Sequence, residues 1–168
     1  MSGSRPPGTV PRVVVIGMGS EYRRDDGAGP AVADEVARTC AGVDRMGPIA
    51  EPLDLLGLWD GADLAVVIDA VRSGADPGSV ELIELVDPEA TDMSGGHPSE
   101  PRGTTSTHGI GLAGVLRLSR AVGEAPGRVV VVGIEGGDFG QGTGLSPAVE
   151  RAVPHAARHV RELIEEVG

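Results

Sequence analysis

Four residues of this 168-residue chain have the side chains and the settings to hold a divalent metal ion. Asp25 and Asp26 are adjacent in a loop after one apolar run, Asp69 ends a second apolar run, and His108 follows a Thr/Ser-rich stretch. Two carboxylates and one imidazole, delivered from three separate loops, can bind a divalent ion and leave coordination positions open. An ion with open positions is suited to catalysis on a bound substrate.

Each of these residues also has a simpler interpretation. Adjacent acids at the entrance of a helix are often only favourable partners for the helix dipole, and a single histidine more often caps a helix or lies on the surface. Topology favours the metal site, because ligands of open parallel sheets bind in the crevice at the carboxyl ends of the strands. We expect Asp25 and Asp26 above one strand and Asp69 above another.

Two further motifs carry weaker signals. The segment 17–20 (Gly-Met-Gly-Ser) suggests a nucleotide-binding turn, but Tyr22 stands where a dinucleotide fingerprint has its third glycine, and no lysine follows. His155 and His159 are four residues apart, yet Ala156 replaces the glutamate that the zincin motif requires. We therefore expect a tight turn at the first motif and exposed histidines at the second.

The predicted elements alternate between apolar, β-branched runs and amphipathic segments, which is typical of an α/β protein with a mostly parallel sheet. The expected strands are residues 12–17, 43–49, 64–70, 80–86 and 128–134. The expected helices are residues 30–41, a short one among the leucines at 53–58, one that begins at Ser106 or Thr107, and one that runs from Ser146 and Pro147 towards Val167.

The strand at 80–86 is predicted to be antiparallel and to lie at an edge of the sheet. Only about nine residues separate it from the strand before it, whereas a helical crossover between parallel strands takes roughly a dozen. Residues 1–11 are expected to form a disordered tail, residues 12–168 a single domain, and residues 87–105 a long loop.

Composition excludes several classes of function. Hydrophobic residues make up 40% of the chain and aromatic residues 2%, so the core must be aliphatic and no stacking platform for single-stranded nucleic acid exists. The formal net charge of −11 repels a phosphate backbone. A lone cysteine, Cys40, and the lack of a signal peptide or membrane-spanning run favour a cytoplasmic protein that binds neither nucleic acid nor membrane.

The order of five short motifs resembles the nickel-iron hydrogenase maturation endopeptidases, over about residues 12–165. The motifs are Val-Val-Ile-Gly-Met-Gly-Ser (14–20), Arg-Asp-Asp-Gly-Ala-Gly-Pro (24–30), Ile-Asp-Ala-Val (68–71), Thr-His-Gly (107–109) and Val-Gly-Ile-Glu (132–135). The resemblance implies a five-stranded twisted sheet flanked by helices, which agrees with the elements predicted above. Together they predict a three-layer α/β fold, with a mostly parallel sheet, an antiparallel edge strand and helices on both faces.

The resemblance also implies a function. Such enzymes remove a short C-terminal extension from the precursor of the hydrogenase large subunit after nickel has been inserted. The family's metal ligands fall on Asp26, Asp69 and His108, and Asp25 precedes the first ligand in a supporting position. Nickel is the expected cofactor, carried by the precursor, and other divalent cations can substitute for it. The precursor is the expected partner.

Two departures and two alternatives accompany this resemblance. The family commonly has Asn where this chain has Ser20, and some members have Glu at the position of Asp26.

In the enzymatic hypothesis a carboxylate outside the metal set, such as Asp25, could take the proton from water. The alternative is a maturation chaperone that recognises the nickel site without cutting. A peptidyl-tRNA hydrolase is disfavoured by the acidic charge.

Overall fold

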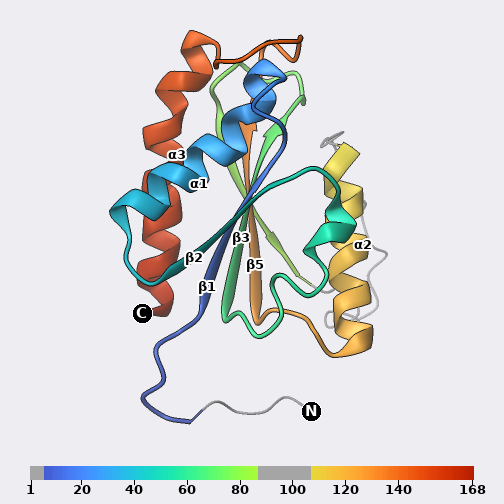
Figure 1. Ribbon diagram of the computed structural model, residues 1–168, viewed down its shortest axis with the longest axis vertical. Coiled ribbons are helices and arrows are strands. Elements are labelled where there is room, and N and C mark those ends of the chain that lie inside the picture. Colours follow the sequence, from blue (N-terminus) through green and yellow to red (C-terminus); the bar gives the residue numbers. More distant parts are fainter. Residues whose placement is uncertain (1–5, 87–106) are drawn as a thin grey trace, which may run out of the picture.

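The computed structural model describes residues 6–86 and 107–168, with side chains from 6–86 and 111–168. Five strands form one sheet in the order β2-β1-β3-β5-β4, and helices cover both of its faces (Figure 1). The strands are β1 (Val13–Met18), β2 (Val43–Ile49), β3 (Leu64–Val71), β4 (Val80–Leu85) and β5 (Arg128–Glu135). The helices are the 3-10 turns η1 (Arg24–Gly27) and η2 (Pro52–Leu55), and α1 (Ala28–Thr39), α2 (Thr107–Val122) and α3 (Pro147–Val167).

The sheet separates two aliphatic cores, because successive side chains of a strand point to opposite faces. In β1, Val13 and Val15 pack on α1 and α3, whereas Val14 and Ile16 pack on the side of η2 and α2. Figure 1 shows the same division, with α1 and α3 together on one side of the sheet and α2 on the other. The three inner strands are apolar on both faces, which explains their continuous β-branched runs.

The predicted fold class is confirmed. β1, β2, β3 and β5 run parallel, and β4 pairs antiparallel with β5 at one edge of the sheet. The antiparallel direction follows from the short connection between β3 and β4, which leaves no room for a crossover helix. The predicted tail, residues 1–11, lies partly outside the described residues, and the predicted long loop, residues 87–105, lies wholly outside them. No helix of the described chain combines the length and the apolar character that crossing a membrane requires.

The first helix differs from its predicted start at Pro30. α1 begins at Ala28 and follows η1 directly. A side chain at Gly29 would collide with the carbonyl oxygens of Met18 and Ile68, so this glycine lets the helix start press onto the ends of β1 and β3. The chain therefore turns immediately above the sheet. The predicted helix among the leucines at 53–58 is only the short turn η2.

Candidate active site

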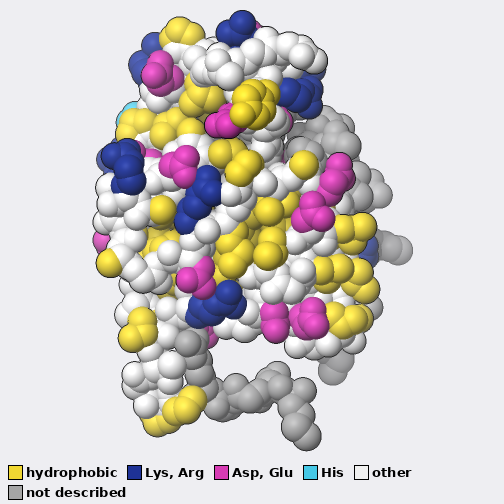
Figure 2. Space-filling view, in the orientation of Figure 1, with side chains coloured by type: hydrophobic (Ala, Val, Ile, Leu, Met, Phe, Trp, Pro, Cys, Tyr) yellow, Lys and Arg dark blue, Asp and Glu magenta, His cyan; other side chains and the backbone are white. Residues whose placement is uncertain are grey.

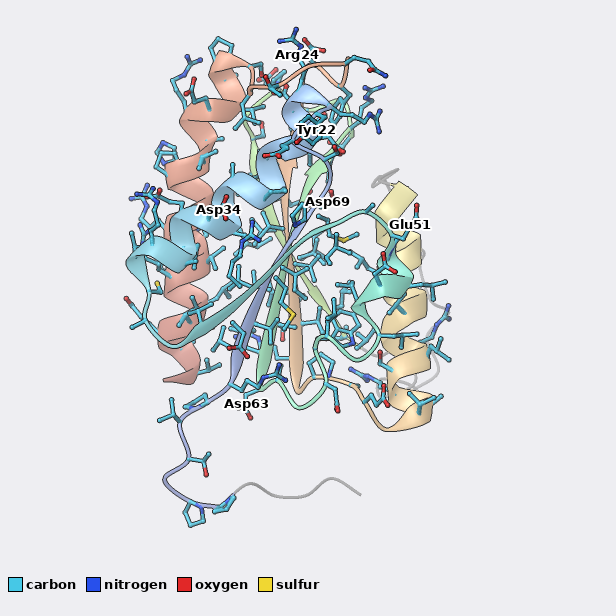
Figure 3. The ribbon with its side chains drawn as sticks, viewed as in Figure 1. Tyr22, Arg24, Asp34, Glu51, Asp63 and Asp69 are labelled. Atoms are coloured by element: carbon cyan, nitrogen blue, oxygen red, sulfur yellow. The ribbon has the colours of Figure 1, made fainter. Side chains whose placement is uncertain are left out.

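The carboxyl ends of the parallel strands meet at one edge of the sheet, which we call the carboxyl edge. Gly17 in β1 pairs with Ile68 in β3, and Asp69 pairs with Gly133 in β5, so the three strands end close together. Asp69 is almost completely buried. Figure 3 labels Asp69 at the upper end of the sheet, below Tyr22 and Arg24, and Asp63 at the opposite end. The predicted position of Asp69 at this edge is therefore what the fold produces.

Asp26 is held over the same edge by the loop that precedes it. The Ser20 backbone N–H donates to one carboxylate oxygen of Asp26 at 2.8 Å. Gly19 has φ 109° and lies so close to Asp26 that a side chain there would strike its carbonyl oxygen. No described residue donates to the other carboxylate oxygen. Because η1 contacts β3, the elements that carry Asp26 and Asp69 come together at the carboxyl edge.

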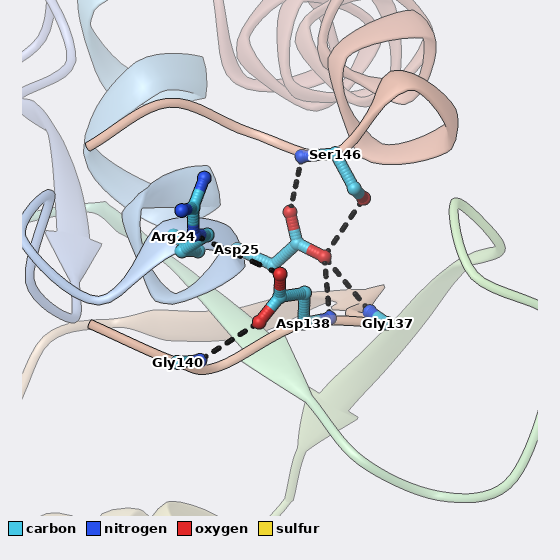
Figure 4. A network of polar contacts seen from close by, with 6 residues as sticks. All are labelled: Arg24, Asp25, Gly137, Asp138, Gly140 and Ser146. Atoms are coloured by element: carbon cyan, nitrogen blue, oxygen red, sulfur yellow. Dashed lines mark hydrogen bonds and ion pairs between the residues drawn. The ribbon is translucent and has the colours of Figure 1, made fainter. Parts of the chain in front are cut away.

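Asp25 has entirely different surroundings from its neighbour (Figure 4). Its side chain is fully buried. One carboxylate oxygen accepts from Ser146 N–H at 2.7 Å. The other accepts from Gly137 N–H at 2.8 Å, Asp138 N–H at 2.9 Å and the Ser146 hydroxyl at 2.8 Å. Asp25 thus ties η1 to both ends of the Gly-rich segment 137–146.

These hydrogen bonds decide the charge state of Asp25. Burial raises its pKa, but the bonds from Ser146, Gly137 and Asp138 together outweigh burial and hold the pKa below its ordinary value. A carboxylate whose oxygens are all engaged by donors is a weak proton acceptor. The geometry is that of a structural anchor, and it argues against the proton-accepting role predicted from sequence.

His108 lies in the first turn of α2, at the end of that helix nearer to the carboxyl edge. Its side chain is outside the described ones, so the convergence of three ligands stays a prediction. Among the side chains that the structure places, no three His, Cys, Asp or Glu residues are grouped so that they could hold a metal ion. The described part of the predicted set is therefore the pair Asp26 and Asp69.

Two structural features of this edge were not predicted from sequence. Glu135, at the end of β5, is buried and accepts from Ser73 N–H and hydroxyl and from Gly74 N–H, which fixes the start of the β3–β4 connection. The Arg72 guanidinium lies over the Phe139 ring, 4.5 Å from its centroid. Ser73 and Glu135 are 62 residues apart in the sequence, and Arg72 and Phe139 are 67 apart, so no local pattern indicates either contact. The one signal in the sequence was the position of Glu135 directly after a predicted strand.

Comparison with known proteins decides the family. The model of the hydrogenase maturation protease family, HycI, matches residues 50–163 of the chain. The hydrogenase expression/formation protein HupD of Rhodobacter capsulatus is 30% identical over 159 residues, which are 90% of this chain and 71% of that protein. The chain belongs to the hydrogenase maturation protease family.

Other members agree over nearly the whole length. The hydrogenase 2 maturation protease of Escherichia coli is 26% identical over 161 residues, covering 94% of this chain and 93% of that protein. The solved structure of the E. coli hydrogenase maturating endopeptidase HybD superposes with a TM-score of 0.74 at 25% identity, covering 94% of each chain. The fold described above is thus that of a hydrogenase maturation protease, and the chain is a protease.

The match to the family model covers only some of the candidate site residues. The segment that matches the hydrogenase maturation protease model includes Asp69 and His108, whereas Asp25 and Asp26 precede it. The argument for Asp26 therefore depends on its place over the carboxyl edge and on its hydrogen bond from Ser20. That bond comes from the backbone, so it does not depend on whether the side chain at position 20 is Ser or Asn.

Proposed function

We propose that this protease removes the C-terminal extension from the large-subunit precursor of a nickel-iron hydrogenase, after nickel has been inserted into that precursor. The observation that carries the proposal is the buried Asp69 at the end of β3, beneath the η1 turn that carries Asp26. Together with His108 these residues would hold the nickel that the substrate brings. The nickel is cargo of the precursor, and other divalent cations can take its place.

The described residues fit such an ion. Carboxylate oxygens and an imidazole nitrogen are suitable ligands for divalent first-row metals. Asp26 uses one oxygen to accept from Ser20 N–H, and no described residue donates to its other oxygen, which can therefore take a ligand. A bound ion of this kind polarises a carbonyl group or lowers the pKa of a water molecule towards neutrality.

The chain's own residues orient the reacting groups. Ser20 N–H fixes the rotation of the Asp26 carboxylate, and the buried setting of Asp69 in the sheet keeps that side chain rigid. Burial also lowers the local dielectric constant, which strengthens the attraction between two carboxylates and a cation. Asp25 contributes by anchoring η1, and with it Asp26, to the segment 137–146.

The proposal is tested by processing of a nickel-loaded precursor, followed by intact mass. We expect Asp69→Asn and His108→Ala to fold normally and to cleave at least about a hundredfold more slowly, because each loses several kcal/mol of ion binding. Asp60→Asn is the matched control, since Asp60 is exposed and close to the opposite end of β3. Cleavage at the parental rate by the first two variants would remove these residues from the mechanism.

Two further measurements separate the alternatives. An unchanged precursor mass after incubation with the wild-type protein would indicate a chaperone that recognises the nickel site without cutting. Crystals soaked with a divalent cation should show anomalous density beside Asp26 and Asp69. Density only at distant surface carboxylates would count against the proposed ligand set.

A further inference from the structure

Three exposed arginines, Arg23, Arg24 and Arg72, stand around the carboxyl edge; we call them the arginine rim. Arg23 and Arg24 directly precede the Asp25–Asp26 pair, and Arg72 follows Asp69 by three residues. Figure 2 shows dark blue side chains at the upper end of the molecule, where Figure 3 labels Tyr22 and Arg24. In a chain with a net charge of −11, cationic groups at this edge need an explanation.

Arg72 is held in place at both its backbone and its guanidinium. The Glu135 carboxylate accepts from the N–H groups of Ser73 and Gly74, which fixes the chain immediately after Arg72. The guanidinium lies 4.5 Å from the centroid of the Phe139 ring. That ring packs so closely on Gly136 that a side chain at Gly136 would collide with it. The orientation of Arg72 is therefore set before any ligand arrives.

The contacts of Gly136 connect Arg72 to the candidate active site. A Cβ atom at Gly136 would lie 3.2 Å from the Cβ of Asp25, and Asp25 precedes the proposed ligand Asp26. Arg72, Phe139, Gly136 and Asp25 thus form one continuous packed row. This row connects the Arg72 guanidinium to the η1 turn that carries Asp26.

Arg72 forms no ion pair within the described part of the chain. Glu135, which binds the two residues that follow Arg72, already accepts from Ser73 and Gly74. Arginines elsewhere on the sheet do have acidic partners: Arg45 is 2.7 Å from Asp34, and Arg128 is 3.0 Å from Glu84. A guanidinium that is preoriented but lacks a carboxylate is suited to accept one from a ligand, because its planar N–H fork matches the two oxygens.

Arg24 also contacts the segment 137–146, at Asp138 and Gly142. Its φ of 48° is left-handed, which costs about 1 kcal/mol outside glycine, and its N–H donates to Gly142 carbonyl at 3.0 Å. Its side chain is 3.7 Å from the Asp138 carboxylate, and both are about half exposed. An exposed pair at this distance is weak, so Arg24 can turn to a ligand at small cost.

We propose that Arg72, assisted by Arg24, forms a subsite that binds a carboxylate in the C-terminal extension of the precursor. This inference rests on the proposed function, since it names what holds the segment that is cut off. The acidic surface elsewhere repels such a group, so the arginine rim both attracts the extension and fixes where it lies. The carboxylate comes either from an Asp or Glu side chain or from the C-terminus of the extension.

The test measures processing rates against the concentration of nickel-loaded precursor. We expect Arg72→Gln to raise KM roughly tenfold and to leave kcat within about twofold, because the contact is lost equally from the bound substrate and the transition state. Arg72→Lys keeps the positive charge but loses the planar N–H fork and the stacking on Phe139. Its KM should therefore lie between the KM of the wild type and that of Arg72→Gln. Arg117→Gln is the matched control, an exposed arginine on α2 that should leave both constants unchanged.

The substrate arms identify the carboxylate. One precursor has each Asp and Glu of its extension changed to Asn or Gln, and another carries a C-terminal amide introduced by ligation. The precursor that lacks the recognised carboxylate should raise the KM of the wild-type enzyme by the same factor as Arg72→Gln does with the unchanged precursor. With that altered precursor, Arg72→Gln should not raise KM further. An unchanged KM in Arg72→Gln, or in both substrate arms, would overturn the subsite.

Failure of the subsite and failure of the proposed function have different outcomes. A wild-type protein that binds the precursor without cutting it refutes the proposed function alone. In that case the dissociation constant replaces KM, and Arg72→Gln must raise it by the same factor for the subsite to stand. A wild-type protein that neither binds nor cuts the loaded precursor overturns both.

Discussion

Asp25 and Asp26 are adjacent carboxylates with opposite surroundings. Asp25 is fully buried and both of its oxygens accept hydrogen bonds from the segment 137–146. Among the described residues, only Ser20 donates to Asp26, which in the proposed function uses its other oxygen for a ligand. The same residue type therefore serves the fold at one position and, in the proposed function, the chemistry at the next.

The pH dependence of stability should report the anchoring by Asp25. Its pKa is below the ordinary value of 3.8 in the folded protein, so the folded state binds fewer protons than the unfolded state in acid. Asp25 therefore stabilises the fold above the unfolded pKa, and this contribution disappears as pH falls through the folded pKa. We expect Asp25→Asn to lose about 3 kcal/mol of unfolding free energy at pH 7.

Urea denaturation at pH 7 and at pH 3 measures this effect. The difference in unfolding free energy between wild type and Asp25→Asn should shrink at the lower pH, because there the unfolded state of the wild type binds a proton at Asp25 more readily than the folded state does. Asp54→Asn, an exposed acid on η2, should show little loss at either pH. A constant difference between wild type and Asp25→Asn at both pH values would show that charge plays no part in the anchoring.

The sequence predicts the placement of Asp26 and Asp69 better than it predicts their environment. An acid at the end of a buried β-branched run must emerge at the carboxyl edge, so Asp69 could be placed from its strand alone. The anchoring role of Asp25 could not, because Gly137 and Ser146 are 112 and 121 residues away in the chain. A Gly-rich stretch gives no sign of which distant carboxylate its N–H groups will meet.

At the scale of elements, the start of α1 decides where the acids lie. Gly29 lets the first turn of α1 approach the carbonyl oxygens of Met18 and Ile68, and η1 is positioned by that contact. The prediction that the helix begins at Pro30 used the preference of proline for a first turn, which does not sense the sheet beneath it. The close approach is a tertiary effect and explains the difference of two residues.

A pair of glycine substitutions tests this contact. Gly29→Ala should lower the unfolding free energy by about 1–3 kcal/mol or more through overpacking, and should reduce processing because η1 is displaced. Gly114 lies inside α2 with open space around it, so Gly114→Ala should instead stabilise the protein by about 0.5–1 kcal/mol. Equal effects of the two variants in urea denaturation would show that Gly29 makes no special contact.

The antiparallel β4 shows what element spacing can predict and what it cannot. The short connection after β3 excluded a parallel crossover, and β4 is indeed antiparallel. The strand order β2-β1-β3-β5-β4 places β5 between β3 and β4, although β4 follows β3 in sequence. The place beside β3 could be taken by either β4 or β5. The length of the β3–β4 connection does not predict which of the two strands takes it.

At the scale of the whole molecule, one sheet joins two separate cores. Leu163 of α3 belongs to the core on the α1 side, and Leu116 of α2 belongs to the core on the opposite side. Trp59, the single tryptophan, is fully buried in the second core, where its indole N–H donates to the Ser119 hydroxyl at 2.9 Å. Its fluorescence therefore reports on one core, whereas far-ultraviolet circular dichroism reports on the whole fold.

The two cores should unfold together, because they share every strand of the sheet. Leu163→Ala and Leu116→Ala should each cost about 2–5 kcal/mol, and their costs should add within about 0.5 kcal/mol in the double variant, since the sheet separates the sites. In urea, the fluorescence and dichroism transitions should coincide for all three variants. Separate midpoints would mean that the α2 side unfolds on its own.

The ties between Asp25 and the segment 137–146 also have a consequence for synthesis of the protein. On the ribosome, η1 emerges long before the N–H groups that its buried carboxylate requires. A nascent chain that has not reached Ser146 lacks two of the hydrogen-bond donors to Asp25, so the carboxylate cannot yet be buried with all of its partners. We therefore expect η1 to reach its final position only after translation has passed Ser146.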